Sequence, residues 1–253
     1  MTLTYEYTTE VRFGREVGLH NILLRCLPAR TTFQQCLCEE LVLSEGFWHE
    51  EGTDGLGNRI VTGGTSMPHK ELAYCVRGAV EVDTYCIPDP SPHPAYLFPT
   101  ALTTTTRDMA ALLPQDDGCG FLDFCLYITH AVHHHIAYTP GVTDMHTTAG
   151  EAFGTRRGVC QDYAHVMIAL LRKAGIPARY VCGLMAGEGQ THAWVEAHDG
   201  NCWYAFDPTN DTAVAYGYIK LAHGRDVADC PVSRGMYTGL TTEETTIKAI
   251  VKS

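Results

Sequence analysis

The segment from Cys160 to Ala174 limits the possible folds of this chain more than any other stretch. Ala, Val, Met, Ile and Leu occupy nearly every side of it, so a helix formed here is predicted to be buried almost all round. Gly158, just before the segment, permits a tight backbone bend. The far end carries helix-stop signals, namely Arg172, Lys173, Gly175 and Pro177. We therefore expect residues 160–174 to form a helix inside the core.

Cys160 lies in the first turn of this predicted helix. The unpaired N–H groups and the positive end of the helix dipole favour a thiolate over a thiol at that position. Cysteine is also one of the most buried residue types, so in a chain with 11 cysteines a small core residue is the simpler interpretation. A base within reach of the thiol would favour a nucleophile instead.

Residues 190–210, QTHAWVEAHDGNCWYAFDPTN, predict a β-hairpin that supplies such a base. The dipeptide Asp199-Gly200 is the strongest two-residue hairpin signal, and strand-forming residues flank it on both sides. A turn at these two residues places His192 directly opposite Asp207, with Cβ atoms about 4.5 to 5.5 Å apart. A carboxylate at that separation can hold an imidazole by one nitrogen, so we predict that Asp207 orients His192.

Cys160, His192 and Asp207 would then form the thiol version of a nucleophile, a base and an orienting group. On the face of the hairpin that carries this pair, Trp194 and Trp203 are predicted to line a substrate groove. The other face is predicted to pack on the core through Ala193, Val195, Ala197, Cys202, Tyr204 and Phe206. The alternative is a purely structural His–Asp pair, or a one-residue shift in register that separates the two side chains.

Three regions of different composition divide the chain. Residues 1–86 contain short period-two stretches separated by glycine-rich turns, which predict an N-terminal antiparallel β-sandwich domain. Residues 87–118 hold six prolines and a threonine run, and we expect a Pro-rich linker or an irregular wrap between domains. Residues 119–253 are expected to form a catalytic domain in which the Cys160 helix packs on an antiparallel sheet. The predicted fold class is therefore α+β.

A second helix is predicted between residues 121 and 136, where apolar residues recur three to four positions apart. Its other side carries His130, His133, His134 and His135. His130 and His134 have the i, i+4 spacing of some metal sites, but no Glu or Cys nearby completes a ligand set. We therefore predict a solvated helix face, and neither a metal nor a cofactor.

Charge and cysteine content narrow the partners and the location. A formal net charge of −11 argues against binding to nucleic acid or to an anionic membrane, since such binding needs clustered Lys and Arg. The first residues lack the apolar core of a signal peptide, and no stretch has the length of a membrane span. Because the cysteine count is odd, the chain is far larger than small disulfide scaffolds and no signal peptide is predicted, the cysteines are expected to be reduced thiols and the protein to be cytoplasmic. No pair of cysteines has the C-x-x-C spacing of a structural zinc knuckle.

Four stretches, GVCQDYAHVMIALLRKAGIPARYVCG, THAWVE, WYAFDPTN and GRDVADCPVSRGMYTG, resemble in order and spacing the bacterial transglutaminase-like proteins. These proteins are a branch of the transglutaminase and papain-like cysteine enzymes. The resemblance covers residues 121–253 and, more weakly, residues 1–85. It implies that Cys160 is the nucleophile, that His192 is the general base and acid, and that Asp207 orients the histidine.

The resemblance also implies acyl transfer from an amide bond through a thioester, on a transglutaminase-like core. The backbone N–H of Cys160 is the expected oxyanion donor, and the Gln161 side chain is a candidate second donor. Asp162 is expected to act through favourable electrostatics at the helix start. In the last motif, Arg225 and Asp226 are expected to form an internal ion pair that braces the site.

Four functions remain open at this point, the weakest of which is metal sensing by the histidine-rich helix. We favour a cysteine peptidase or amidase with water as the acyl acceptor. An amine-accepting transglutaminase would use the same residues and would differ in whether an amine enters and water is excluded. The third possibility, a binding or scaffold protein with an inert core, is disfavoured by the intact triad. The partner expected for the first two is a peptide or protein substrate.

Overall fold

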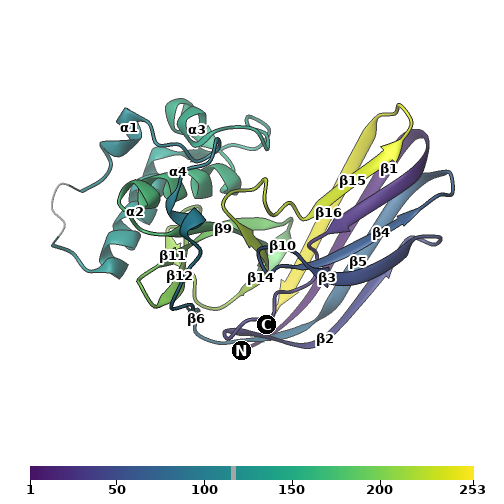
Figure 1. Cartoon of the computed structure of the whole chain (residues 1–253), viewed down its shortest axis with the longest axis horizontal. Helices are drawn as coiled ribbons and strands as arrows, with labels where there is room; N and C mark the ends of the chain where they lie inside the picture. The colour runs from purple at the N-terminus through teal and green to yellow at the C-terminus, as the bar shows by residue number, and fades with distance from the viewer. Residues whose placement is uncertain (115–117) are drawn as a thin grey trace.

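A long strand organises the N-terminal part of the computed structural model, which describes residues 1–114 and 118–253 (Figure 1). Within these residues its antiparallel sheet has eight strands: β1 (Thr2–Leu24), β2 (Gln34–Leu43), β3 (Trp48–Thr53), β4 (Arg59–Thr65), β5 (His69–Val82), β10 (Gly187–Gly189), β15 (Ser233–Thr238) and β16 (Glu243–Lys252). The first half of β1 pairs with β5 and β16, and its second half pairs with β4 and β15. The pairing with β5 is irregular between Arg12 and Val17, and such irregularities bend a strand. β1 is thus common to both halves of one curled sheet.

The C-terminal strands belong to this sheet. We predicted that residues 119–253 form one catalytic domain, but β15 and β16 return to pair with β1, and β10 pairs with β16. The reason is burial: Ala249 and Val251 of β16 lie opposite Tyr7 and Tyr5 of β1, and all four side chains are buried. The predicted boundary therefore corresponds to no division between the sheets, because the chain crosses between the two parts several times.

The second sheet carries the predicted hairpin and follows the order β13-β12-β11-β9-β14, with β6 paired to β12. Its strands are β6 (Ile87–Pro88), β9 (Ala178–Met185), β11 (His192–His198), β12 (Cys202–Asp207), β13 (Thr212–Ala213) and β14 (Tyr218–Gly224). A separate short parallel pair consists of β7 (Ala137–Tyr138) and β8 (Arg157–Gly158). β8 leads directly into the helix that carries the candidate nucleophile.

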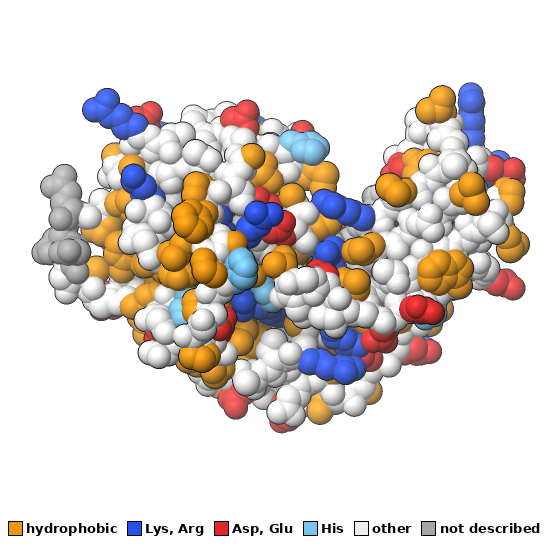
Figure 2. All heavy atoms as spheres, viewed as in Figure 1, with side chains coloured by type: hydrophobic (Ala, Val, Ile, Leu, Met, Phe, Trp, Pro, Cys, Tyr) orange, Lys and Arg blue, Asp and Glu red, His pale blue; other side chains and the backbone are white. Residues whose placement is uncertain are grey.

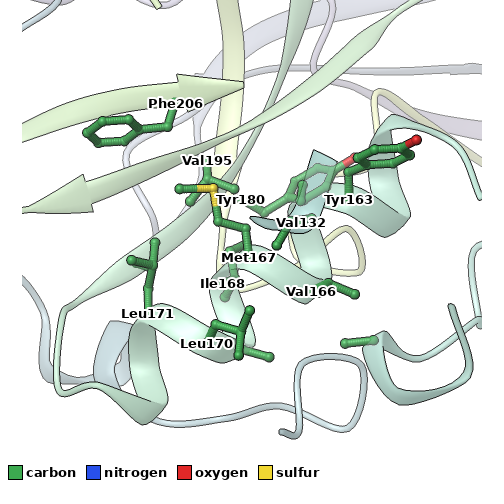
Figure 3. Close-up of a cluster of buried hydrophobic side chains, with 14 of the residues drawn as sticks. Val132, Tyr163, Val166, Met167, Ile168, Leu170, Leu171, Tyr180, Val195 and Phe206 are labelled. Atoms are coloured by element: carbon green, nitrogen blue, oxygen red, sulfur yellow. The ribbon is translucent and has the colours of Figure 1, made fainter. Parts of the chain in front are cut away.

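Helix α4 (Cys160–Lys173) is buried from Asp162 to Arg172, as its sequence predicted. Figure 3 shows Met167 and Leu171 of this helix facing Val195 and Phe206 of the sheet, in one apolar cluster. Gly175 ends the helix with a φ of 81°, which is the left-handed conformation expected of a C-terminal glycine. The helices that cover α4 are α1 (Arg107–Ala110), α2 (Phe121–His135) and α3 (Ala149–Thr155).

The Pro-rich segment lies against the core in its described part, residues 87–114 and 118. Besides β6 it contains a short 3-10 helix at Pro94–Leu97, in which Tyr96 is buried, and Met109 of α1 is also buried. The indole of Trp203 donates a hydrogen bond to Asp89 at 2.9 Å, and the Nε2 of His198 bonds the Asp89 carbonyl at 2.7 Å. The segment is therefore the irregular wrap of our two expectations, and the rest of the predicted linker, residues 115–117, lies outside the described residues.

The α+β class is confirmed: an antiparallel β domain precedes a core in which a helix with an N-terminal cysteine packs on an antiparallel sheet. The 11 cysteines, all within the described residues, are free thiols. Among the helices of the described residues, none combines the length and apolar character needed to cross a membrane.

Candidate active site

Cys160 is the first residue of α4 and is half-buried. The loop before it is held by Asp162, whose carboxylate accepts hydrogen bonds from the N–H of Val159 and the hydroxyl of Thr143, both at 2.7 Å. A Cβ on Gly158 would lie 2.5 Å from that carboxylate, so glycine is required there for a steric reason. Asp162 is buried, and burial raises its pKa in spite of these bonds. Its role is thus more specific than the electrostatic one we expected: it sets the backbone that presents Cys160.

Asp207 holds His192 as predicted. The Nε2 of His192 lies 2.6 Å from Oδ2 of Asp207, which is fully buried. The same oxygen accepts hydrogen bonds from the amide of Asn210 at 2.7 Å and from the hydroxyl of Tyr218 at 2.9 Å. Burial alone would raise the pKa of Asp207, but the hydrogen bond from His192 and these further donors lower it. Asp207 is therefore a fixed negative charge behind the imidazole.

The pKa of His192 is strongly shifted by its two partners. Burial lowers its pKa, but the hydrogen bonds to Asp207 and Cys160 outweigh burial and raise the pKa to about 10. Because Nε2 is committed to Asp207, Nδ1 is the nitrogen that remains for Cys160. An imidazolium in this position stabilises a thiolate, which is the nucleophilic form of cysteine.

The hairpin that positions this pair turns one residue later than predicted. The N–H of Asp199 donates to the carbonyl of Cys202, so the two-residue loop is Gly200-Asn201 and not Asp199-Gly200. The Asp199 side chain accepts the N–H groups of Asn201 and Cys202, which stabilises this later turn. A turn displaced by one residue changes the pairing by two. Each side chain therefore stays on its predicted face.

His192 and Asp207 are consequently diagonal neighbours on one face of the hairpin. The register that the structure shows pairs Val195 with Phe206 and His198 with Trp203. Direct opposition of His192 and Asp207 was wrong, whereas their contact was correctly predicted. The apolar face is also as predicted, since Ala193, Val195, Ala197 and Phe206 belong to the cluster around α4.

Cys160 and His192 lie in a cleft of about 990 Å³ between the β domain and the core. Figure 2 shows this hollow between the two lobes of the molecule. The core contributes Tyr138, Gln161 and Met185 to its lining, and the β domain contributes Phe13, His20, Tyr74 and Tyr237. Among the described residues that line it, Glu188 and Glu243 carry carboxylates and no Lys or Arg is present. The cleft is therefore wide, partly aromatic and weakly acidic.

The two tryptophans of the hairpin take no part in this cleft. Both Trp194 and Trp203 are fully buried, so their predicted role in a substrate groove is wrong. Trp194 donates to the hydroxyl of Tyr85 at 3.3 Å, and Trp203 donates to Asp89. Their side of the sheet is covered by the segment that follows the β domain.

Two further predicted roles change. The side-chain amide of Gln161 donates to the carbonyl of Asp144 at 3.0 Å, so it ties down a loop instead of pointing freely at the reaction centre. Arg225 pairs with Asp229 at 2.7 Å and not with Asp226, because the turn at residues 227–229 brings the Asp229 carboxylate back to both the backbone N–H and the guanidinium of Arg225. Asn210 and Tyr218 were not foreseen as partners of Asp207. Asn210 follows it in the motif WYAFDPTN, which is the one local signal that could have indicated it.

The histidines of α2 also find a partner that their own helix does not supply. A side-chain oxygen of Asp211 lies 2.8 Å from Nδ1 of His130, and one ligand atom each of His130, His134 and Asp211 falls within 4.8 Å of the others. Our prediction of a solvated face rested on the absence of a nearby Glu or Cys to complete a ligand set, and it did not consider an aspartate from another segment. The acidic residue comes from the turn after β12.

Comparison with known proteins identifies both parts of the chain. Residues 116–208 match the transglutaminase-like superfamily, and residues 3–81 match the bacterial transglutaminase-like N-terminal region. An uncharacterized protein of Mycobacterium leprae is 40% identical over 112 residues, which are 40% of this chain and 40% of that protein. A protein-glutamine gamma-glutamyltransferase of Pseudomonas aeruginosa is 35% identical over 128 residues, which are 43% of this chain and 19% of that protein. The chain thus spans less than half the length of these two relatives.

A solved structure shares the whole fold. A protein from Cytophaga hutchinsonii, proposed to be a cysteine protease, superposes with a TM-score of 0.79 at 24% sequence identity. The match covers 100% of this chain and 92% of that one. The pairing of a curled β domain with this core is therefore an arrangement found in another protein.

Proposed function

Because this chain joins a core of the transglutaminase-like superfamily to a bacterial transglutaminase-like N-terminal region, we propose that it is a cysteine-dependent enzyme that cleaves amide bonds of peptides or proteins. The observation that carries this proposal is the position of His192 between Asp207 and Cys160. His192 is held through Nε2 by the buried Asp207, and its raised pKa depends in part on Cys160 at the start of α4.

The proposed reaction begins with the Cys160 thiolate, which attacks the carbonyl carbon of an amide. A C–S bond forms, and the carbonyl oxygen becomes negatively charged. The first N–H groups of α4 have no partner within the helix, and the N–H of Cys160 supplies a hydrogen bond to this oxygen. When the C–N bond breaks, the imidazolium of His192 gives its proton to the departing amine. The product of this step is a thioester on Cys160.

Water completes the reaction in the favoured version. Neutral His192 takes a proton from water, the resulting hydroxide adds to the thioester carbonyl, and the C–S bond breaks to release a carboxylic acid and the Cys160 thiolate. Asp207 keeps the imidazole in position throughout. A polypeptide substrate is supported by the position of the cleft, which is lined on one side by the β domain and on the other by the core.

Amine transfer is the second candidate, and one observation favours it. Glu188 and Glu243 give the cleft lining a negative character that attracts a cationic amine such as a lysine side chain. The Pseudomonas relative named a protein-glutamine gamma-glutamyltransferase points in the same direction. In that version a deprotonated amine takes the place of water in the second step.

The location of the protein in the cytoplasm, which we expect from its sequence, stays a prediction.

Site-resolved alkylation tests the proposed nucleophile. The folded, reduced protein is treated with iodoacetamide between about pH 5 and 8, and the labelled cysteines are identified by mass spectrometry. We expect Cys160 to react fastest at the acid end and to lose that advantage in His192→Ala. Cys38, which is exposed, serves as the internal reference for an ordinary thiol. Equal labelling of Cys160 and Cys38 at acid pH would contradict the proposal and favour an inert core.

A second assay separates the two acceptors. The protein is incubated with a glutamine-containing protein substrate, with and without a labelled primary amine, and both amide hydrolysis and amine incorporation are measured. Hydrolysis that a Cys160→Ala variant abolishes supports the peptidase or amidase. Incorporation of the amine without hydrolysis would replace it by the transglutaminase.

A further inference from the structure

Helix α2 and the turn after β12 bring three potential metal ligands together on the surface of the core. His130 and His134 lie one helical turn apart, and their ring centroids are 4.0 Å from each other. Asp211 reaches them from a turn that is 81 residues away from His130 in the sequence. One ligand atom from each of the three residues lies within 4.8 Å of the other two.

The hydrogen bond of His134 prepares its ring for a metal ion. Its Nδ1 lies 3.0 Å from the carbonyl oxygen of His130, and a carbonyl can only accept, so Nδ1 carries the proton. In the neutral ring Nε2 is then unprotonated, with a lone pair free to coordinate. Metal-binding histidines commonly donate their second nitrogen to a backbone carbonyl in this way, which fixes both tautomer and ring orientation.

The backbone of Asp211 is held in an uncommon conformation. Its φ is 52°, in the left-handed region that residues other than glycine seldom adopt. The carboxylate that this conformation presents lies 2.8 Å from Nδ1 of His130 and retains side-chain exposure of 29%. Solvent access of this kind leaves room for an ion and for water on the outer side of the cluster.

We propose that His130, His134 and Asp211 form a binding site for one divalent transition-metal ion, with Zn²⁺ as the best match. Two imidazoles and one carboxylate are a ligand set that suits zinc and its neighbours, whereas Mg²⁺ and Ca²⁺ prefer oxygen ligands throughout. Three protein ligands leave at least one coordination position for water. None of the three residues is among the described residues that line the catalytic cleft, so this site is distinct from the triad.

Such an ion would join α2 to the turn that follows the catalytic aspartate. Asp207 accepts the N–H groups of Thr209 and Asn210, and the Nδ1 of His133 lies 3.2 and 3.1 Å from the carbonyls of Pro208 and Thr209. The turn is therefore already bound to Asp207 on one side and to α2 on the other. A metal ion on Asp211 would strengthen the second attachment and stabilise the folded protein, since it binds the folded state and not the dispersed ligands of the unfolded chain.

The test uses the full chain without a polyhistidine tag and with Zn²⁺ or Co²⁺ as the probe. We expect one equivalent of Zn²⁺ to bind by calorimetry and to raise Tm by several degrees, and Co²⁺ to give visible bands without a thiolate charge-transfer band. Asp211→Asn keeps a residue type that tolerates positive φ, so it should fold while weakening Zn²⁺ binding at least roughly tenfold. His134→Ala should do the same, whereas His49→Ala, at an exposed histidine of β3, should leave binding unchanged.

Three results would overturn the proposal. The first is the lack of saturable binding in the wild-type protein. The second is binding that Asp211→Asn and His134→Ala leave intact. The third is a Co²⁺ spectrum dominated by thiolate ligands, which would assign the ion to the cysteines.

Discussion

Strand β11 carries two charged clusters on one face of the same sheet. One cluster borders the open cleft, whereas the other is enclosed in the core. The catalytic cluster consists of His192 with Asp207, Asn210 and Tyr218, and it borders the cleft. Four residues further along the strand, the buried cluster consists of Glu196 with Arg179, Lys220 and Tyr85. Both combine a buried carboxylate with a positive partner, yet only the first leaves a nitrogen directed toward the cleft.

Glu196 is a buried charged residue that does not border the cleft. It is fully buried, and its two oxygens accept hydrogen bonds from Lys220 at 2.7 and 2.9 Å, from Arg179 and from the hydroxyl of Tyr85. Burial would raise its pKa, but Arg179 and Lys220 keep the pKa low and the carboxylate ionised. Burial and Arg179 lower the pKa of Lys220 to about 7. Perturbed pKa values therefore occur in both clusters, and it is the open nitrogen of His192 that distinguishes the functional one.

The sharpest test of this contrast is Cys160→Ala, for which we expect the largest effect. Removing the nucleophile should lower kcat/KM by roughly 10⁴-fold or more, equivalent to about 5.5 kcal/mol, because the covalent step becomes impossible. Tm should stay close to that of the wild type, since the side chain is half-buried and only slightly larger than alanine. Steady-state assays and thermal unfolding measure both quantities. Cys38→Ala, at an exposed cysteine, should change neither.

Glu196→Gln should produce the reverse pattern. The variant leaves Arg179 and Lys220 buried without their counter-charge, which should cost about 3–5 kcal/mol of the free energy of unfolding. Activity per folded molecule should be retained because Glu196 does not border the cleft. Urea unfolding with Glu50→Gln, at an exposed position of β3, as a control measures the difference. Unchanged stability of Glu196→Gln would show that the buried cluster is not structural.

A milder variant covers the case in which Glu196→Gln does not fold. Tyr85→Phe removes a single hydrogen bond to Glu196 and should cost about 1 kcal/mol. Retained activity together with this smaller loss would place the buried cluster in the same structural role.

The parts of the catalytic cluster that depend on local signals could be predicted from the sequence. The helix of residues 160–173 follows from its apolar sides and its stop signals, and it places Cys160 at a helix start. The shared face of His192 and Asp207 survived an error in the turn, because moving a turn by one residue shifts the pairing by two. The face on which a strand residue lies can thus be predicted more reliably than the residue that it pairs with on the neighbouring strand.

The parts that failed depend on distant segments. Trp194 and Trp203 are on the predicted face, but residues 109 and 114 positions away in the sequence cover them. Asp211 completes the histidine pair of α2 from 81 positions away. The return of β16 to β1 also lacks a local signal, since its sequence only alternates. Each of these contacts is decided by tertiary packing, which periodicity does not report.

The pH dependence of activity separates the clusters on a finer scale. His192 has a pKa raised to about 10, so the thiolate–imidazolium pair should persist through neutral pH and be lost as the pH rises through about 10. Asp207→Asn should move this alkaline limit down by about 1–2 pH units, or about 1.4–2.7 kcal/mol, because the charged acceptor is gone. The sign for stability agrees: His192 contributes stability that is fully present below about pH 6.5 and is lost as the pH rises through about 10.

The pH–rate profile of kcat/KM measures this limit in the free enzyme. Glu196→Gln is the matched control, since it removes a carboxylate from the same strand face without touching His192 and should leave the limit in place. An unchanged alkaline limit in Asp207→Asn would mean that Asp207 does not set the charge of His192. The catalytic cluster would then not differ from the Glu196 cluster in the way that we propose.

Tyr218→Phe should give the smallest effect and test how tightly the catalytic carboxylate is held. The hydroxyl of Tyr218 donates a hydrogen bond to the same Asp207 oxygen that bonds His192. Its removal takes away one of the three side-chain hydrogen bonds of that oxygen. A lost hydrogen bond of this kind costs about 1 kcal/mol, which corresponds to roughly fivefold in kcat/KM if Asp207 then holds His192 less firmly. Tyr216→Phe changes an exposed tyrosine two residues away and should have no effect. If Tyr218→Phe lowers Tm by the expected amount but leaves kcat/KM and its pH profile unchanged, Tyr218 belongs to the packing of the core, and the catalytic cluster shrinks to His192, Asp207 and Asn210.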